Sequence, residues 1–272
     1  PRIFRKKLEV AIKDKNRQLV KVYNQLPLDV DVVFDEYMGY ADQLTDHITD
    51  TSLVVWNALE RGENVLFEGA QGTLLDIDHG TYPFVTSSNP TAGGAAVGIG
   101  IGPKQIDSVI GVVKAYISRV GTGPFPTELH DETGDRLIDI GGEYGVVTGR
   151  RRRCGWLDAV ALRYAVRVNG LTEIALTKLD VLSHFDTIKI ATAYTSLGER
   201  YTDFPRQQRV LYNCTPHYEE HEGWGDDITG AESYEDLPDK AKAYVEKIEE
   251  LAGVPIRTVS VGPARSATLE KP

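Results

Sequence analysis

The sequence is poor in cysteine and lacks long apolar runs. Cys154 and Cys214 are its only cysteines, which are too few for a disulfide framework and do not have metal-ligand spacing, as is usual in a reducing cytoplasm. No run of 18 apolar residues and no basic-then-apolar signal segment occurs, so neither a membrane span nor secretion is supported. Internal repeats and low-complexity tracts are also missing. These absences leave an ordinary globular chain.

Positive charge is scarce overall. The 272 residues carry 30 Lys and Arg against 40 Asp and Glu, a formal net charge of −10. Because binding to DNA or RNA is driven by neutralisation of phosphates, this charge argues against nucleic acid as the main partner. The 41% hydrophobic content and the length are sufficient for a large α/β core.

One basic cluster, Arg150 to Arg153, stands out against this acidic background. The residues that follow it return at once to an apolar-rich pattern, so the cluster is embedded in a fold. Planar guanidinium groups bind two oxygens at once, which favours a pocket for phosphates or carboxylates. In an extended segment Arg150 and Arg152 would face one side, and Arg151 and Arg153 the other. A solvated basic edge remains the alternative.

Apolar spacing divides the chain into alternating helices and strands, and this alternation predicts an α/β fold with a mainly parallel sheet covered by helices on both faces. Residues 108–118 fit either a helix or a strand, and residues 86–103 are dense in Ser, Thr and Gly and are expected to be rich in loops. Helices are expected at 4–11, 34–48, 53–59, 158–168 and 238–252, and strands at 64–67, 172–177, 187–194 and 255–261.

Two short segments that end predicted strands have the chemistry of a guanine site. In Thr177-Lys178-Leu179-Asp180 the Asp carboxylate can accept from both the N1–H and the 2-amino group of guanine, whereas adenine lacks the 2-amino donor. Ser260-Val261-Gly262 can hold the base edge from the other side through a hydroxyl and a backbone amide. An ordinary surface pair and a simple strand exit are the alternatives for these two segments.

A glycine-rich turn and the loop after it carry further candidates. Gln71 lies between Ala70 and Gly72, so its amide is free either to stabilise negative charge on a carbonyl oxygen or to bond to backbone or water. We interpret residues 76–79 (Asp-Ile-Asp-His) as structural, because no further His or Cys completes a metal-ligand set nearby. Residues 86–88 (Thr-Ser-Ser) offer hydroxyl groups to a phosphate.

Eight longer motifs resemble those of the adenylosuccinate synthetase family. They follow one another in the family's order and cover the chain from end to end. The motifs are Phe67–Gly72, Asp76–Pro83, Val85–Asn89, Arg119–Gly121, Gly123–Leu129, Thr148–Arg153, Thr177–Leu182 and Ser260–Pro263.

The resemblance implies a ligase that forms a C–N bond between inosine monophosphate (IMP) and L-aspartate in AMP biosynthesis. GTP phosphorylates the purine 6-oxygen, and the aspartate amino group then displaces the phosphate to give adenylosuccinate. The resemblance further implies a P-loop-NTPase-like GTP-binding architecture, Mg²⁺, a homodimer and a cytoplasmic location. A largely helical segment, 1–62, and a substrate- and guanine-binding part, 63–272, would form a single α/β domain.

The resemblance also implies a role for each matching residue. Gln71 would stabilise the purine 6-oxygen, and Val120 would pack against the ribose. IMP would be bound by Gln71, Thr86, Val120 and Arg150; aspartate by Val146, Val147, Thr148, Gly149, Arg150, Arg151 and Arg152; and GTP by Arg152, Lys178, Leu179, Asp180, Ser260, Val261 and Gly262.

Two departures from the family pattern stand out. The loop reads Val146-Val147-Thr148, where the family often carries an extra threonine, so one aspartate contact would be made by backbone. Nothing like the family's Gly-Asp-Glu-Gly-Lys-Gly-Lys phosphate loop occurs, and the chain opens on Pro1 inside a helical pattern. We therefore expect part of a longer protein, whose Mg²⁺ ligands and catalytic aspartate and histidine lie outside this chain.

Because phosphoryl transfer depends on positioning and charge neutralisation by such groups, the sequence predicts no synthetase activity for the chain alone. Two alternatives remain open. The chain could be a non-catalytic module that binds guanine nucleotides, or it could bind nucleic acid through Arg150 to Arg153, which the acidic charge disfavours.

Overall fold

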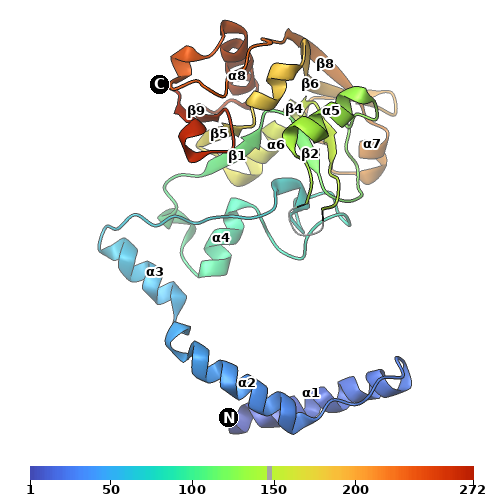
Figure 1. Cartoon of the computed structure of the whole chain (residues 1–272), viewed down its shortest axis with the longest axis vertical. Helices are drawn as coiled ribbons and strands as arrows, with labels where there is room; N and C mark the ends of the chain where they lie inside the picture. Colours follow the sequence, from blue (N-terminus) through green and yellow to red (C-terminus); the bar gives the residue numbers. More distant parts are fainter. Residues whose placement is uncertain (146–148) are drawn as a thin grey trace. The chain divides into compact units, whose positions relative to one another are not determined.

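The computed structural model describes residues 1–145 and 149–272. They form two compact units, Pro1–Gly62 and Glu63–Pro272 (Figure 1).

The first unit is helical. Asp29 caps the second helix by accepting from the Asp31 and Val32 amides, and Asp50 caps the third by accepting from Leu53 N at 3.2 Å, as aspartate commonly does at helix N-termini. The helices are α1 (Arg2–Lys21), α2 (Val30–Leu44), the 3₁₀ turn η1 (Thr45–His47) and α3 (Thr51–Glu60).

The second unit is built on a sheet with the order β1-β5-β9-β10. Strands β1 (Ile110–Lys114), β5 (Glu173–Thr177) and β9 (Ile256–Ser260) are parallel, and β10 (Thr268–Glu270) is antiparallel at the edge. This sheet confirms the predicted mainly parallel arrangement. The ambiguous stretch 108–118 contains strand β1 and the start of β2 (Ile117–Arg119).

A second sheet in the same unit is mostly antiparallel, which the sequence pattern did not reveal. Strand β6 (Thr187–Ser196) pairs in parallel with β4 (Leu157–Asp158) and antiparallel with both β7 (Glu199–Tyr201) and β8 (Thr215–Glu222). Strands β2 and β3 (Arg153–Gly155) form a separate antiparallel pair. The prediction of parallel pairing therefore holds only for the first sheet.

Helices α6 and α8 pack against each other and contribute to the main core of this unit. The helix expected at 238–252 is α8, and Gly253 ends it at φ 74°, where a left-handed residue is needed and glycine adopts it without strain. The helices are α4 (Ala92–Ile99), α5 (Glu132–Gly141), α6 (Ala159–Asn169), α7 (Gln208–Tyr212) and α8 (Asp239–Ala252), with 3₁₀ turns η2 (Thr73–Leu75), η3 (Pro103–Gln105), η4 (Asp180–His184), η5 (Tyr234–Asp236) and η6 (Arg265–Ala267).

Two local expectations were wrong. Residues 64–67 form no strand, because a strand needs a neighbour for its backbone hydrogen bonds and no described strand pairs with them. Residues 86–103 were expected to be rich in loops but contain helix α4, which ends at Gly100 with φ 81°.

Among the described residues, no helix is both long and apolar enough to cross a bilayer. Cys154 is buried, Cys214 is half-buried, and both are free thiols. Burial raises the pKa of Cys154 to about 12 and that of Cys214 to about 11.

Candidate functional site

The two guanine candidates meet at the carboxyl ends of neighbouring parallel strands, β5 and β9 (Figure 1). Leu179 N donates to Ser260 O at 3.2 Å and joins the two segments. The side chains of Leu179 and Val261 are fully buried, so these two residues offer a ligand only their backbone. Burial raises the pKa of Asp180.

Lys178 has a backbone conformation that is unusual for a residue with a side chain. Its φ is 60°, in the left-handed region, where non-glycine residues are uncommon and cluster at functional sites. Its ammonium group donates to Gly141 O at the end of α5 and lies 3.9 Å from a carboxylate oxygen of Glu143. Lys178 therefore links the guanine candidate at the end of β5 to the end of α5.

Glu143 lies at the centre of a charged network. Its side chain has no solvent exposure, and its carboxylate accepts from Lys114 Nζ and Tyr116 Oη, both at 2.6 Å, and from Arg152 Nη1 at 2.9 Å. Burial opposes ionisation, but the hydrogen bonds from Lys114 and Tyr116 outweigh it and lower the pKa of Glu143.

The arginine cluster divides among several carboxylates of the chain itself. Arg151 pairs with Asp135, Arg152 with Glu143 and Arg153 with Glu128. Arg153 also donates to the carbonyls of Gly121 and Gly123 and so fixes that turn. Arg152 and Arg153 are thus built into the fold, and the alternative of a solvated basic edge is wrong for these two residues, whereas Arg151 is exposed and pairs with Asp135 at the surface.

The same arginines form one side of a hairpin. Arg152 N donates to Glu143 O and Gly145 N donates to Arg150 O, both at 2.8 Å, and Gly149, just before Arg150, has φ 63°. The aspartate-binding candidates Val146, Val147 and Thr148 lie outside the described residues. Arg152 Nε is buried and has no acceptor among the described residues.

Two loops that carry IMP candidates are tied together by Arg119. Its guanidinium donates to Thr81 Oγ1 and to Phe84 O, both at 3.0 Å. Thr86 follows this segment and is half-buried. Val120, the residue after Arg119, is 50% exposed.

Asp76 organises the loop that leads to Thr86. Its buried carboxylate accepts from the amides of Asp78, His79 and Thr91 and from the Thr91 hydroxyl. Burial opposes ionisation, but these hydrogen bonds outweigh it and lower the pKa of Asp76 to about 2.

Among the described residues, the Gln71 side chain makes no hydrogen bond to the Arg119 and Asp76 loops or to the Glu143 network. Its side chain is exposed, and its backbone is in the left-handed region at φ 62°. Two of the sequence candidates, Gln71 and Lys178, thus share this uncommon conformation.

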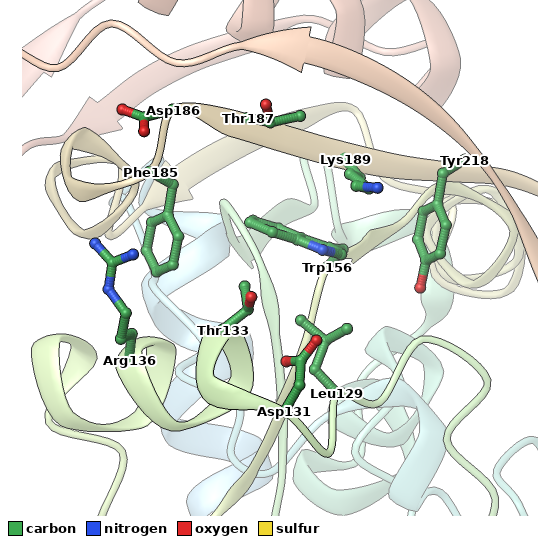
Figure 2. A pocket seen from close by; sticks show the side chains of 10 residues that line it. All are labelled: Leu129, Asp131, Thr133, Arg136, Trp156, Phe185, Asp186, Thr187, Lys189 and Tyr218. Atoms are coloured by element: carbon green, nitrogen blue, oxygen red, sulfur yellow. The ribbon is translucent and has the colours of Figure 1, made fainter.

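A cavity of about 350 Å³ lies elsewhere in the unit (Figure 2). Arg136 lies 4.8 Å above the Phe185 ring, and Trp156 meets the same ring edge-on at 5.5 Å. None of the site residues predicted from the sequence lines this cavity.

Sequence reasoning missed Glu143, Lys114 and Tyr116. Lys114 and Tyr116 lie 29 and 27 residues before Glu143, and no local pattern links residues at such separations. Only the topology of the sheet brings them together.

The described residues contain no group of three or more His, Cys, Asp and Glu side chains that could hold a metal ion. Within residues 76–79, the Asp76 carboxylate accepts hydrogen bonds from amides of its own loop.

Comparisons with known proteins agree over the whole chain. The sequence profile of the adenylosuccinate synthetase family matches residues 1–269. Adenylosuccinate synthetases of Parafrankia sp. (strain EAN1pec) and Thermobifida fusca (strain YX) are 57% and 56% identical to it, over 99% of this chain and 63% of each relative. The solved structure of the fully ligated adenylosuccinate synthetase from Plasmodium falciparum matches with a TM-score of 0.91 at 38% identity, over 99% of this chain and 63% of that one. The chain thus spans about 63% of the length of these relatives.

Proposed function

The chain belongs to the adenylosuccinate synthetase family, and we propose that it is the substrate-binding part of a ligase that joins IMP to L-aspartate with GTP. The product would be adenylosuccinate, formed through a purine phosphorylated at its 6-oxygen. The meeting of the Lys178–Asp180 and Ser260–Gly262 segments at the ends of β5 and β9 is the observation that carries the proposal.

The guanine end of GTP would bind where these two segments meet. Asp180 would accept from the guanine N1–H and 2-amino groups, and the backbone of Val261 and Gly262 would contact the opposite base edge. The stem of Lys178 would lie along the base. Ligands of α/β sheets bind at the carboxyl ends of parallel strands, and these segments occupy that position.

The arginine hairpin would hold the two other substrates. Arg150 would reach aspartate and the inosinate ribose, and Arg152 would reach aspartate and GTP. Arg152 Nε is buried and has no acceptor within residues 1–145 and 149–272, which supports this role, because a guanidinium donor left without an acceptor is costly unless another group supplies one. Arg151 and the loop 146–149 would complete the aspartate site.

The purine would lie between the loops that Arg119 joins. Thr86 would bind the 5′-phosphate, Val120 would pack against the ribose, and the Gln71 amide would stabilise negative charge that develops at the 6-oxygen. The left-handed backbone of Gln71 supports this role, since such strain is retained where the surrounding structure needs it.

Several features of the whole enzyme belong to the same proposal. They are a homodimer, a cytoplasmic location, and Mg²⁺ held by residues outside this chain. No phosphate-loop sequence of the family occurs in these 272 residues. We therefore expect the chain alone to bind nucleotide but not to convert IMP, aspartate and GTP to adenylosuccinate.

Nucleotide binding by the purified chain tests the guanine site. We expect GDP to bind more tightly than ADP, and Asp180→Asn to weaken GDP binding at least about tenfold, because the amide places a donor opposite a guanine donor. Isothermal titration calorimetry measures both affinities. Asp226→Asn, which changes an exposed aspartate, is the matched control and should leave the affinity unchanged. Equal affinity for GDP and ADP would refute the guanine site.

The second candidate function is a non-catalytic guanine-nucleotide module. The same guanine geometry would support it. Assays of adenylosuccinate formation with the chain alone and with the complete protein separate the two. Activity of the complete protein with none from the chain supports the proposal, whereas absence of activity in both favours the module.

A further inference from the structure

We propose that Glu143 is a positioning residue that holds Arg152 and Lys178 in the geometry in which they meet their ligands. The inference rests on the proposed function of those two cations. Glu143 itself is too deeply buried to touch a substrate, since its side chain has no exposure. It acts through its neighbours.

The position of Glu143 links two parts of the site that are far apart in the sequence. Its backbone carbonyl accepts from Arg152 N at the base of the arginine hairpin. Its carboxylate binds the Arg152 guanidinium at 2.9 Å and lies 3.9 Å from Lys178 Nζ. One side chain therefore contacts the hairpin and the residue that follows strand β5.

The charges around Glu143 explain why a carboxylate is needed there. Lys114, Arg152 and Lys178 all lie within 3.9 Å of its oxygens, so three cations surround one anion. Without that anion the cations would repel one another and separate. The remaining excess of positive charge suits a site for phosphates and carboxylates.

A positioning role and a purely electrostatic role of Glu143 predict changes of opposite sign in nucleotide affinity when Glu143 is neutralised. If Glu143 only lowered the local positive potential, its neutralisation would tighten the binding of an anionic nucleotide. If it only stabilised the fold, its neutralisation would leave the affinity unchanged. A positioning residue predicts weaker binding, because Lys178 loses the attraction of the carboxylate at 3.9 Å and keeps only its hydrogen bond to Gly141 O.

The test replaces Glu143→Gln in the complete 272-residue chain and measures GDP binding by calorimetry. We expect an affinity about tenfold lower than that of the unmodified chain, the size of effect expected when hydrogen bonds to a charged group are lost. In a Lys178→Met background the same change should have at most about a threefold effect, because the two residues act together.

Tyr116→Phe is the matched control. It removes the hydroxyl that donates to the same carboxylate oxygen at 2.6 Å without changing any charge. We expect it to lower the melting temperature while the affinity for GDP stays within about twofold, because the three cations keep their anion. Glu143→Asp keeps the charge and should recover part of the affinity. If Glu143→Gln does not fold, the GDP affinity of Glu143→Asp is compared with that of the unmodified chain instead.

A second readout needs no nucleotide and so separates this inference from the guanine site. Lysines of the chain are labelled with an amine-reactive ester, and the rate at Lys178 is followed by mass spectrometry against the exposed Lys13. We expect at least about fivefold faster labelling of Lys178 in Glu143→Gln and no change in Tyr116→Phe, because only the first removes the negative charge that attracts the ammonium group.

Unchanged labelling of Lys178 in Glu143→Gln overturns the inference, as does GDP affinity that is unchanged or higher. If the unmodified chain binds no GDP, the guanine site fails, and the labelling experiment still decides whether Glu143 positions Lys178.

Discussion

At the scale of single residues, two buried carboxylates, Asp158 and Asp76, have pKa values shifted in opposite directions, depending on the hydrogen-bond donors around each. Asp158 is 2% exposed and accepts from Val160 N and Ala161 N at 3.0 Å and from the Tyr194 hydroxyl. Burial outweighs these bonds and raises the pKa of Asp158 to about 6. Asp76 accepts from several amides and has a lowered pKa instead.

The raised pKa of Asp158 predicts a pH dependence of stability. Between about pH 4 and 6 the folded chain keeps the Asp158 proton that the unfolded chain releases, so this residue stabilises the fold fully below about pH 4 and loses its contribution as the pH rises through about 6. Asp158→Asn mimics the protonated form. We expect the variant to gain about 3 kcal/mol relative to the unmodified chain between about pH 4 and pH 7.

Urea unfolding of both proteins at several pH values across this range measures the difference. The other titrating groups are common to the two proteins and cancel in the comparison. A difference in unfolding free energy that does not vary with pH would contradict the raised pKa.

At the scale of elements, helix α4 shows how the surroundings of a glycine decide what it tolerates. A Cβ at Gly93 would meet open space, whereas a Cβ at Gly94 would lie 2.0 Å from Asn89 O. Asn89 is itself held by hydrogen bonds to Asp76 and Asp78, so this carbonyl has little freedom to move. Of two adjacent glycines in one helix, Gly93 therefore has room for a side chain and Gly94 does not.

These surroundings predict effects of opposite sign for the same substitution. Gly93→Ala should raise the free energy of unfolding by roughly 0.5 kcal/mol, because alanine is the better helix former. Gly94→Ala should lower it by about 2 kcal/mol, because the backbone of Asn89 would have to shift. Thermal and urea unfolding of the two variants provide the comparison, and destabilisation of equal size in both would contradict it.

The strand expected at 64–67 does not form, which shows that the pattern of one segment is not enough to predict a strand. Its apolar residues fit a strand, but no described strand lies beside them to share hydrogen bonds. By contrast, β5, β6 and β9 fall close to their predicted positions, because each has neighbours in a sheet that suit its pattern.

At the scale of the whole molecule, the main core belongs to the second unit. The buried residues of its two apolar clusters run from Ala115 to Leu269, and none of them comes from Pro1–Gly62 among the described residues. The second unit therefore contains the apolar contacts that a domain needs to fold alone.

This arrangement predicts that residues 63–272 fold without the helical unit. A chain that begins at Glu63 should keep its circular dichroism and melt within about 4 °C of the intact protein, a shift that corresponds to roughly 1 to 2 kcal/mol in a domain of this size. Loss of a cooperative melting transition in the shortened chain would show that the sheet unit depends on the helices before it.

The sequence by itself determined several helices, among them α3, α6 and α8, two of the three parallel strands, β5 and β9, and the order of the family motifs. These follow from residues close together in the chain, such as Asp50 before α3 or Gly253 after α8, whose backbone preferences act locally. It also indicated an anion site at Arg150 to Arg153. It did not reveal that Arg151, Arg152 and Arg153 bind three different carboxylates of the chain.

Only the tertiary structure decided where the charges meet. The sheet order places the ends of β5 and β9 together and brings Lys114, Arg152 and Lys178 to Glu143. Such a network depends on burial, which strengthens electrostatic interactions by excluding water, and burial follows from how distant segments pack. No spacing along the chain encodes it.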